Sequence, residues 1–214
     1  MSREASRTTR AAQTAVDAVY ERLAPVYDVI YGALLHHGRK SAIARLAPTA
    51  GESILEVGVG TGLSALKYPR GCRVIAIDLS AHMLDRARAR LARHRAANVT
   101  LCRMDAGRLA FSDAQFDAVY APYVMNVVAD PVLVAREMQR VCRPAGRIVL
   151  LNHFEDAGSK RDPIDRVLDP LLSRIGVNWR IDLGAFLKDA GLIARSIERV
   201  NLPRVSTVVV CEKA

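Results

Sequence analysis

The sequence predicts an α/β fold built around a mostly parallel sheet. Five apolar, β-branched runs alternate with helix-like segments, which is typical of βαβ units. Two further runs at the C-terminal end are separated by little more than Pro203 and indicate an antiparallel hairpin. A turn with three glycines directly follows the first run. The ligand of this turn is therefore the main functional question.

The bulk properties favour one domain over residues 1–214. The chain has 214 residues, of which 50% are hydrophobic, so it can bury a core and is not generally disordered. Its four cysteines are scattered without a CxxC pair, which fits a reducing compartment and predicts no metal site. The polar start MSREASRTTR and the lack of an apolar run of about 20 residues predict a soluble or peripheral protein without a transmembrane segment.

The formal net charge of +9 favours a polyanionic neighbour. Nucleic acid and the anionic face of a membrane both have this character. Composition does not choose between them, and a merely solvated basic surface also fits.

A kinked amphipathic helical arm, residues 1–40, precedes the predicted sheet. Its apolar residues recur at helical spacing and are interrupted by Pro25. They are Val16, Val19, Tyr20, Leu23, Tyr27 and Ile30. We expect the arm to cover the domain as a lid and not to fold separately.

Five strands and three helices are predicted after the arm, followed by the hairpin. The strands are SILEVG (53–58), RVIAIDLS (73–80), VTLCRM (99–104), FDAVYA (116–121) and RIVLLNHF (147–154). One helix starts near Ser80, a second starts at Asp130-Pro131 and stops within 141–146, and a third covers 182–191. The hairpin strands are 194–202 and 205–213.

The helix that starts near Ser80 has two contrasting sides. One side is apolar and consists of Met83, Leu84, Ala87 and Leu91. The other is basic and consists of Arg86, Arg88, Arg90, Arg93 and Arg95. We interpret these arginines as a solvated face, with contact to anionic lipid headgroups as the second interpretation.

The glycine turn lies in LEVGVGTG (55–62), and three cofactors compete for it. A triphosphate loop needs GxxxxGK[ST], but Leu63 and Ser64 follow the last glycine. A dinucleotide needs GxGxxG, whereas Gly58, Gly60 and Gly62 form GxGxG, and Glu56 would repel a pyrophosphate. S-adenosylmethionine carries a sulfonium and an ammonium, which favour an acid at this strand end. Bare glycines also let the backbone approach its amino-acid end.

Two more acids follow at the ends of the next two strands. Asp78 comes twenty-two residues after Glu56, where a carboxylate can accept both ribose hydroxyls. Asp105 ends the third strand, where it can meet the adenine amino group. Three acids at three successive strand ends therefore indicate one ligand, S-adenosylmethionine. The predicted cofactor site also includes Leu79, Met83, Ala106 and Ala121.

These motifs resemble those of the class I S-adenosylmethionine-dependent methyltransferases. The resemblance extends from Leu55 to the terminal hairpin and includes RVCRPAGRIVLLNH, in which Ala145 replaces the commoner glycine. It implies a Rossmann-like, seven-stranded, mostly parallel sheet in which only the last strand is antiparallel. The last two strands would then be neighbours at one edge.

A closer resemblance is to the soluble bacterial phosphatidylethanolamine N-methyltransferases. It rests on YERLAPVYDVIYG, LEVGVGTGLS, DLSAHMLDRAR, APYVMNVVADP and LLNHF. It implies stepwise methylation of phosphatidylethanolamine to phosphatidylcholine by a cytoplasmic enzyme that binds the anionic inner membrane surface peripherally. Quinone C-methyltransferases share the arm pattern and much of the cofactor half, so a quinone or other small molecule is an alternative acceptor. A nucleic-acid methyltransferase is a further alternative, but no Asp/Asn-Pro-Pro-Tyr tetrad is present, and we expect no nucleic-acid partner.

An amine acceptor must lose a proton before each methylation, because an ammonium has no lone pair. His153, just past the fifth strand, is the best-placed candidate for a proton acceptor or a hydrogen-bond partner of the amine, and water is the alternative acceptor. Tyrosine faces attract a methylated ammonium by about 0.5–2 kcal/mol. In the resembled fold, Tyr20, Tyr27, Tyr123 and His153 converge where the arm closes over the carboxyl ends of strands four and five, so the resemblance implies that they are the catalytic residues. The predicted substrate-binding residues are Asn126, Trp179 and Arg180, with Arg180 as the candidate for the lipid phosphate.

Overall fold

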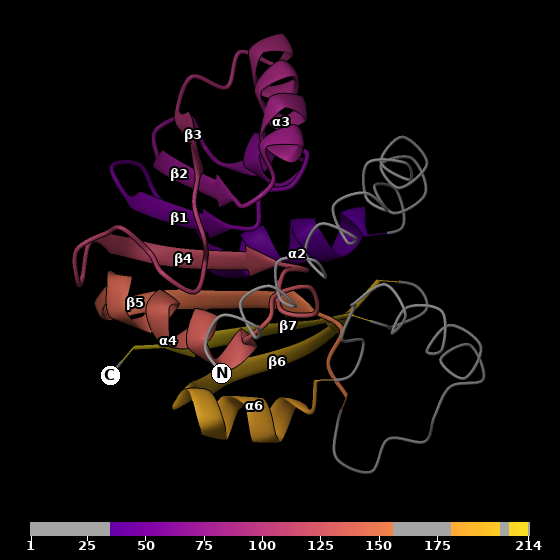
Figure 1. Ribbon diagram of the computed structural model, residues 1–214, viewed down its shortest axis with the longest axis vertical. Coiled ribbons are helices and arrows are strands. Elements are labelled where there is room, and N and C mark those ends of the chain that lie inside the picture. Colours follow the sequence, from indigo (N-terminus) through magenta and orange to yellow (C-terminus); the bar gives the residue numbers. More distant parts are fainter. Residues whose placement is uncertain (1–34, 156–180, 202–205, 214) are drawn as a thin grey trace, which may run out of the picture.

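A computed structural model describes residues 35–155, 181–201 and 206–213, and it confirms the predicted α/β class (Figure 1). Its seven strands form one sheet in the order β3-β2-β1-β4-β5-β7-β6. The strands are β1 (Ser53–Val57), β2 (Arg73–Asp78), β3 (Val99–Arg103), β4 (Phe116–Pro122), β5 (Cys142–Asn152), β6 (Ile193–Val200) and β7 (Ser206–Glu212). The first five pair in parallel, and β7 is antiparallel to both β5 and β6. The hairpin therefore lies at one edge, as predicted, with β6 outermost.

Helices cover both faces of the sheet. On one face, α2 (His36–Leu46) and α3 (Ala81–Arg93) pack in a core that includes Ile54, Val74 and Val149. On the other, α4 (Pro131–Val141) and α6 (Leu183–Ala190) pack in a second core that includes Leu55 and Ile148. Neighbouring residues of one strand enter opposite cores because side chains alternate along a strand.

The helix boundaries follow local capping signals, as the sequence predicts. Ser80 Oγ accepts the Met83 N–H at 3.3 Å, and Asp130 Oδ1 accepts the Leu133 N–H at 2.9 Å. Asp182 Oδ1 caps α6 by accepting the Ala185 N–H at 2.7 Å. The same helix ends at Gly191, whose φ of 70° is left-handed. These three helices begin at polar N-caps that satisfy their first backbone donors.

The fifth strand starts earlier than predicted. Helix α4 ends at Val141, and β5 begins at Cys142 instead of Arg147. Ala145, which lies in the part of β5 that precedes Arg147, has a φ of 57°. A left-handed φ costs a residue with a Cβ about 1–2 kcal/mol, which explains why glycine is the commoner residue at this position of the resembled pattern. The pairing of β4 with β5 is correspondingly irregular between Phe116 and Ala118.

The predicted arm falls largely outside the described residues. Its last residues, 36–40, form the start of α2. Arg147 on β5 holds the far end of this helix: its Nε donates to the Leu46 carbonyl at 2.8 Å, and its Nη2 lies 2.8 Å from the Glu52 carboxylate. The C-terminal end of α2 is thereby anchored to the Arg147 end of β5.

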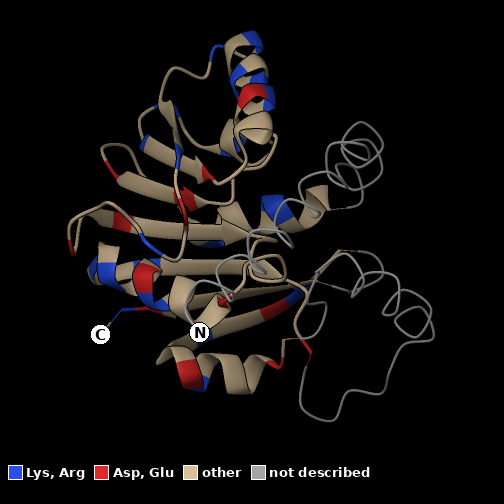
Figure 2. Ribbon diagram, viewed as in Figure 1, with Lys and Arg blue, Asp and Glu red and all other residues tan. Residues whose placement is uncertain are grey.

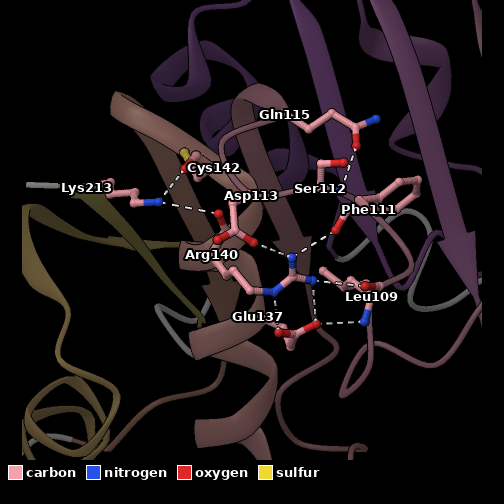
Figure 3. Close-up of polar contacts among 9 residues, drawn as sticks. All are labelled: Leu109, Phe111, Ser112, Asp113, Gln115, Glu137, Arg140, Cys142 and Lys213. Carbon is pink, nitrogen blue, oxygen red and sulfur yellow. Dashed lines mark hydrogen bonds and ion pairs between the residues drawn. The ribbon is translucent and has the colours of Figure 1, made fainter.

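The connection between β3 and β4 is held by Arg140 of α4, as Figure 3 shows. Its guanidinium donates to the carbonyls of Leu109 and Phe111 at 2.9 and 2.8 Å. It also forms ion pairs with Glu137 at 2.7 Å and Asp113 at 2.8 Å. This cluster fixes the loop that begins with Asp105.

Replacing Arg140 with methionine should lower the free energy of unfolding by about 1–3 kcal/mol, because two carbonyls and the half-buried Glu137 lose a charged donor. Arg88→Met is the matched control, since the Arg88–Asp85 side chains are 65% and 71% exposed. Its effect should stay within about 0.5 kcal/mol. Urea unfolding measures the free energy of unfolding of both variants. Equal decreases in the two would contradict the stabilising role of Arg140 in the connection between β3 and β4.

Candidate active site

The three glycines after β1 adopt backbone conformations that side chains rarely tolerate. Gly58, Gly60 and Gly62 have φ values of 73°, 53° and 82°. A Cβ on Gly58 would lie 2.7 Å from Val124 Cγ2, and one on Gly62 would lie 3.3 Å from Ala87 Cβ. At Gly60 a Cβ would meet none of the described residues within 4 Å. The turn is thus packed at both ends, and its middle glycine is where a ligand can approach the backbone.

Asp78 closes this turn from the end of β2. Its Oδ2 accepts the Gly60 N–H at 2.7 Å, and its Oδ1 accepts the Ser80 N–H at 2.9 Å. A carboxylate offers about four acceptor positions, enough for these backbone groups and a further hydroxyl donor. The structure therefore places the predicted ribose-binding acid against the predicted turn.

Glu56 is a fully buried acid at the end of β1. Neither carboxylate oxygen has a hydrogen-bond partner in good geometry among the described residues. Burial raises the pKa of Glu56 to about 8, although the nearby Tyr68 hydroxyl, the Arg39 charge and the Ser64 hydroxyl act in the opposite direction. An incoming cation would stabilise the ionised carboxylate, so the site favours a positively charged ligand.

The other predicted cofactor residues lie at or just beyond the carboxyl ends of β2, β3 and β4 or in the first turn of α3, and they differ in how far they are exposed. Asp105 lies two residues beyond β3, is exposed, and its Oδ1 accepts the Gly107 N–H at 2.8 Å. Leu79 is 43% exposed, and Met83 and Ala106 are partly buried. Ala121 differs because it is fully buried in the core beneath α4 and α6.

One prediction about α3 is wrong. Arg90 does not belong to a solvated face, because its Nη1 donates to the Thr61 carbonyl at 2.5 Å and to Thr61 Oγ1 at 2.7 Å. It therefore braces the glycine turn from α3. The sequence did carry a signal for this contact. Arg90 lies three residues after Ala87 and next to Leu91, so it borders the apolar side of the helix that faces the domain. Figure 2 shows further basic residues along the same helix.

Arg39 is a second functional candidate that the sequence analysis missed. Its guanidinium lies 5.0 Å from the centre of the Tyr123 ring. Its Nη1 is buried and has no hydrogen-bond partner in the described part of the chain. Its positive charge opposes the rise in the pKa of Glu56 that burial causes. A buried carboxylate and a guanidinium in one region complement a zwitterionic amino acid, which is the character of the methionine end of S-adenosylmethionine.

The structure brings three predicted acceptor-side residues together at the ends of β4 and β5. The rings of Tyr123 and His153 lie 5.6 Å apart. Burial raises the pKa of Tyr123, partly offset by hydrogen bonds from Ser206 and Asn201. Asn126 is buried, and its Nδ2 donates to the His153 carbonyl at 3.4 Å. The remaining predictions, Tyr20, Tyr27, Trp179 and Arg180, lie outside the described residues.

Residues 35–155, 181–201 and 206–213 form neither a metal-binding cluster nor a membrane-spanning helix. No group of three or more His, Cys, Asp or Glu side chains lies together as a metal site. Within these ranges no helix has the length and apolar character that crossing a bilayer requires.

Comparison with known proteins identifies the family. Residues 55–150 match a methyltransferase domain. A phosphatidylethanolamine N-methyltransferase of Cereibacter sphaeroides is 37% identical over 196 residues, which cover 91% of this chain and 89% of that protein. The chain belongs to the class I S-adenosylmethionine-dependent methyltransferases. Its cofactor is S-adenosylmethionine, which agrees with the charge of the site.

This methyltransferase is also similar to a quinone methyltransferase in sequence and to a solved methyltransferase in fold. A demethylmenaquinone methyltransferase of Tropheryma whipplei (strain Twist) is 36% identical over 137 residues, but these cover 62% of this chain and 56% of that protein. The fold is similar to the crystal structure of a SAM-dependent methyltransferase from Aquifex aeolicus, with a TM-score of 0.68 and 16% identity over 92% of this chain and 98% of that one.

Removing the Asp78 carboxylate should weaken S-adenosylmethionine binding. In Asp78→Ala the Gly60 and Ser80 N–H groups lose their acceptor. The free energy of S-adenosylmethionine binding should therefore become less favourable by about 1–3 kcal/mol. Titration calorimetry measures it, with circular dichroism as a check of folding. Arg88→Met should bind normally. Unchanged affinity in a folded Asp78→Ala protein would exclude this acid from the site.

The buried Glu56 should make the stability of the cofactor-free enzyme depend on pH. The folded-state pKa of about 8 exceeds the ordinary value of 4.5, so the folded state holds the proton between these values while the unfolded state has lost it. Stability should therefore fall as pH rises from about 5 to 8, by about 1 kcal/mol per pH unit. Urea unfolding across this range should show a flatter profile for Glu56→Gln. Parallel profiles for the two proteins would contradict the burial argument.

Proposed function

We propose that this methyltransferase N-methylates phosphatidylethanolamine, stepwise towards phosphatidylcholine, at an anionic membrane surface. The observation that carries the proposal is the extent of similarity. Similarity to the Cereibacter sphaeroides phosphatidylethanolamine N-methyltransferase covers 91% of this chain. The Tropheryma whipplei demethylmenaquinone methyltransferase is similar over 62%. Acceptor recognition depends on parts outside the shared cofactor half, so the longer match favours the lipid.

The side chains at the ends of β4 and β5 suit an amine acceptor. S-adenosylmethionine, when bound, supplies an electrophilic methyl group on a sulfonium. The amine nitrogen must present a lone pair to it, so the ammonium must first give up a proton. We assign proton acceptance to His153 and orientation of the amine to Tyr123. Arg39, 5.0 Å from the Tyr123 ring, disfavours a second positive charge nearby and therefore lowers the pKa of an amine held there.

The remainder of the proposal concerns residues outside the described part of the chain. Tyr20 and Tyr27 of the arm would complete the aromatic surroundings of the amine, and Trp179 and Arg180 would bind the phosphate side of the headgroup. The net charge of +9 would favour peripheral binding to the cytoplasmic face of the inner membrane. Each basic residue near an anionic surface contributes on the order of 1 kcal/mol.

A quinone is the second candidate acceptor. It is favoured by the similarity to the demethylmenaquinone methyltransferase, which is 36% identical where it matches. Methylation of a ring carbon requires no amine, so the two functions differ in their product.

Expression in a bacterial host that makes phosphatidylethanolamine but no phosphatidylcholine should produce methylated phosphatidylethanolamines, detectable by mass spectrometry of extracted lipid. Tyr123→Phe should lower their yield about 10-fold or more if the hydroxyl orients the amine, while exposed Ser196→Ala on β6 should not. With purified enzyme, methylation in vesicles should rise with anionic lipid content and fall with salt. A methylated quinone without any methylated lipid would replace the proposal with the second candidate.

A further inference from the structure

Asn201 joins three segments that are far apart in the sequence. It follows β6 directly, is buried, and has a left-handed φ of 70°. Its Oδ1 accepts the Gly38 N–H of α2 at 2.7 Å. Its Nδ2 donates to Tyr123 Oη at 3.0 Å and to Ser206 Oγ at 2.8 Å. One amide thus connects α2, the end of β4 and the start of β7.

These contacts define which way the amide faces. The Gly38 N–H is a donor, so the atom that meets it must be the amide oxygen. The NH₂ group then faces the two hydroxyls, and its two hydrogens are donated to two oxygen atoms. Because Tyr123 Oη and Ser206 Oγ each accept a hydrogen from Asn201, their own protons must point away from it. Asn201 therefore sets the direction in which both hydroxyls donate.

The second hydroxyl reaches the predicted proton acceptor. Ser206 Oγ lies 3.5 Å from His153 Nδ1, and the His153 ring lies 5.6 Å from the Tyr123 ring. A partner at one imidazole nitrogen helps to determine the tautomer and the ring orientation. The influence of Asn201 thus extends through Ser206 to His153.

The surroundings of the amide are close-packed and strained. A Cβ on Gly38 would lie 2.7 Å from Tyr123 Oη and 2.8 Å from Asn201 Nδ2, so α2 can approach only with glycine here. Tyr123 itself has a φ of 57°, which is unusual for a bulky side chain. Strain of this kind persists where surrounding contacts over-determine a conformation, and such places are often functional sites.

We propose that Asn201 is the positioning residue of the acceptor side, which orients the Tyr123 hydroxyl directly and His153 through Ser206. This rests on the proposed function only in taking Tyr123 and His153 as the residues that face the methyl acceptor. The chemical class of the acceptor does not enter the geometry.

Asn201→Asp is the sharpest test because it keeps the size of the side chain and an oxygen for the Gly38 N–H while removing both donors. Tyr123 and Ser206 must then turn their protons toward the new carboxylate. We expect kcat to fall about 10- to 100-fold, with the cofactor Kd within about twofold of the wild-type value. Asn98→Asp is the matched control, because its amide donates to the Pro69 carbonyl away from this cluster. It should leave kcat unchanged.

A readout independent of turnover is the titration of Tyr123, followed by NMR with tyrosine labelled at Cζ and assigned with Tyr123→Phe. The bonds from Asn201 and Ser206 lower the Tyr123 pKa. Their loss, together with the new negative charge, should raise the pKa further. Ser206→Ala, which adds no charge, should also raise it and lower kcat, and it keeps the test available if Asn201→Asp does not fold.

Three results would overturn the proposal: an unchanged kcat in folded Asn201→Asp or Ser206→Ala, an unmoved Tyr123 signal in both, or equal losses of kcat and cofactor affinity. The last result would mean general damage to the site. Failure of the proposed function looks different. In that case wild-type enzyme would not methylate phosphatidylethanolamine, while Asn201→Asp would still shift the Tyr123 titration.

Discussion

The carboxylate of Asp78 connects the end of β2, the turn after β1 and the start of α3, and the cofactor half of the site depends on it. Its oxygens accept the N–H groups of Gly60 and Ser80 at 2.7 and 2.9 Å. A turn with three glycines loses much conformational entropy on folding, so it needs contacts that hold it closed. Arg90 adds a second connection, from α3 to Thr61. With both in place, the backbone at Gly60 can meet a ligand directly.

Two ionisable side chains, Glu56 and Arg39, lie in the interior next to this turn. Glu56 is fully buried and lacks a described hydrogen-bond partner, and burial raises its pKa. Arg39 contributes the opposite charge from α2, and its effect reaches Glu56, Tyr120 and Tyr123. Buried groups of this kind are costly unless they are compensated. A cofactor with an ammonium, a sulfonium and a carboxylate would supply that compensation, so its binding would offset the cost of burying these groups.

The acceptor half is built differently, from neutral donors and acceptors. The Gly38 N–H, the Asn201 amide and the hydroxyls of Tyr123 and Ser206 form one connected network. Its members come from α2, β4 and the β6–β7 hairpin, so the antiparallel hairpin does more than complete the sheet. This neutral network fixes the orientation of the Tyr123 hydroxyl, and the charge beside the amine comes from Arg39 on α2, whose guanidinium lies over the Tyr123 ring.

Local signals in the sequence determined the class of fold, most helix boundaries and the cofactor. The polar caps Ser80, Asp130 and Asp182 act on backbone groups three residues away, strand alternation is equally short-range, and Glu56, Gly58 and Asp78 lie within one βαβ-like stretch of the chain. Only the tertiary structure decided that Arg90 braces the turn, that Arg39 lies over Tyr123, and that Asn201 bonds to Gly38. Gly38 and Asn201 are 163 residues apart. They meet because the strand order places β7 beside β5, with α2 packed across that face. Capping and alternation depend on neighbours along the chain, whereas such contacts depend on how the sheet is assembled, which no short stretch of sequence encodes.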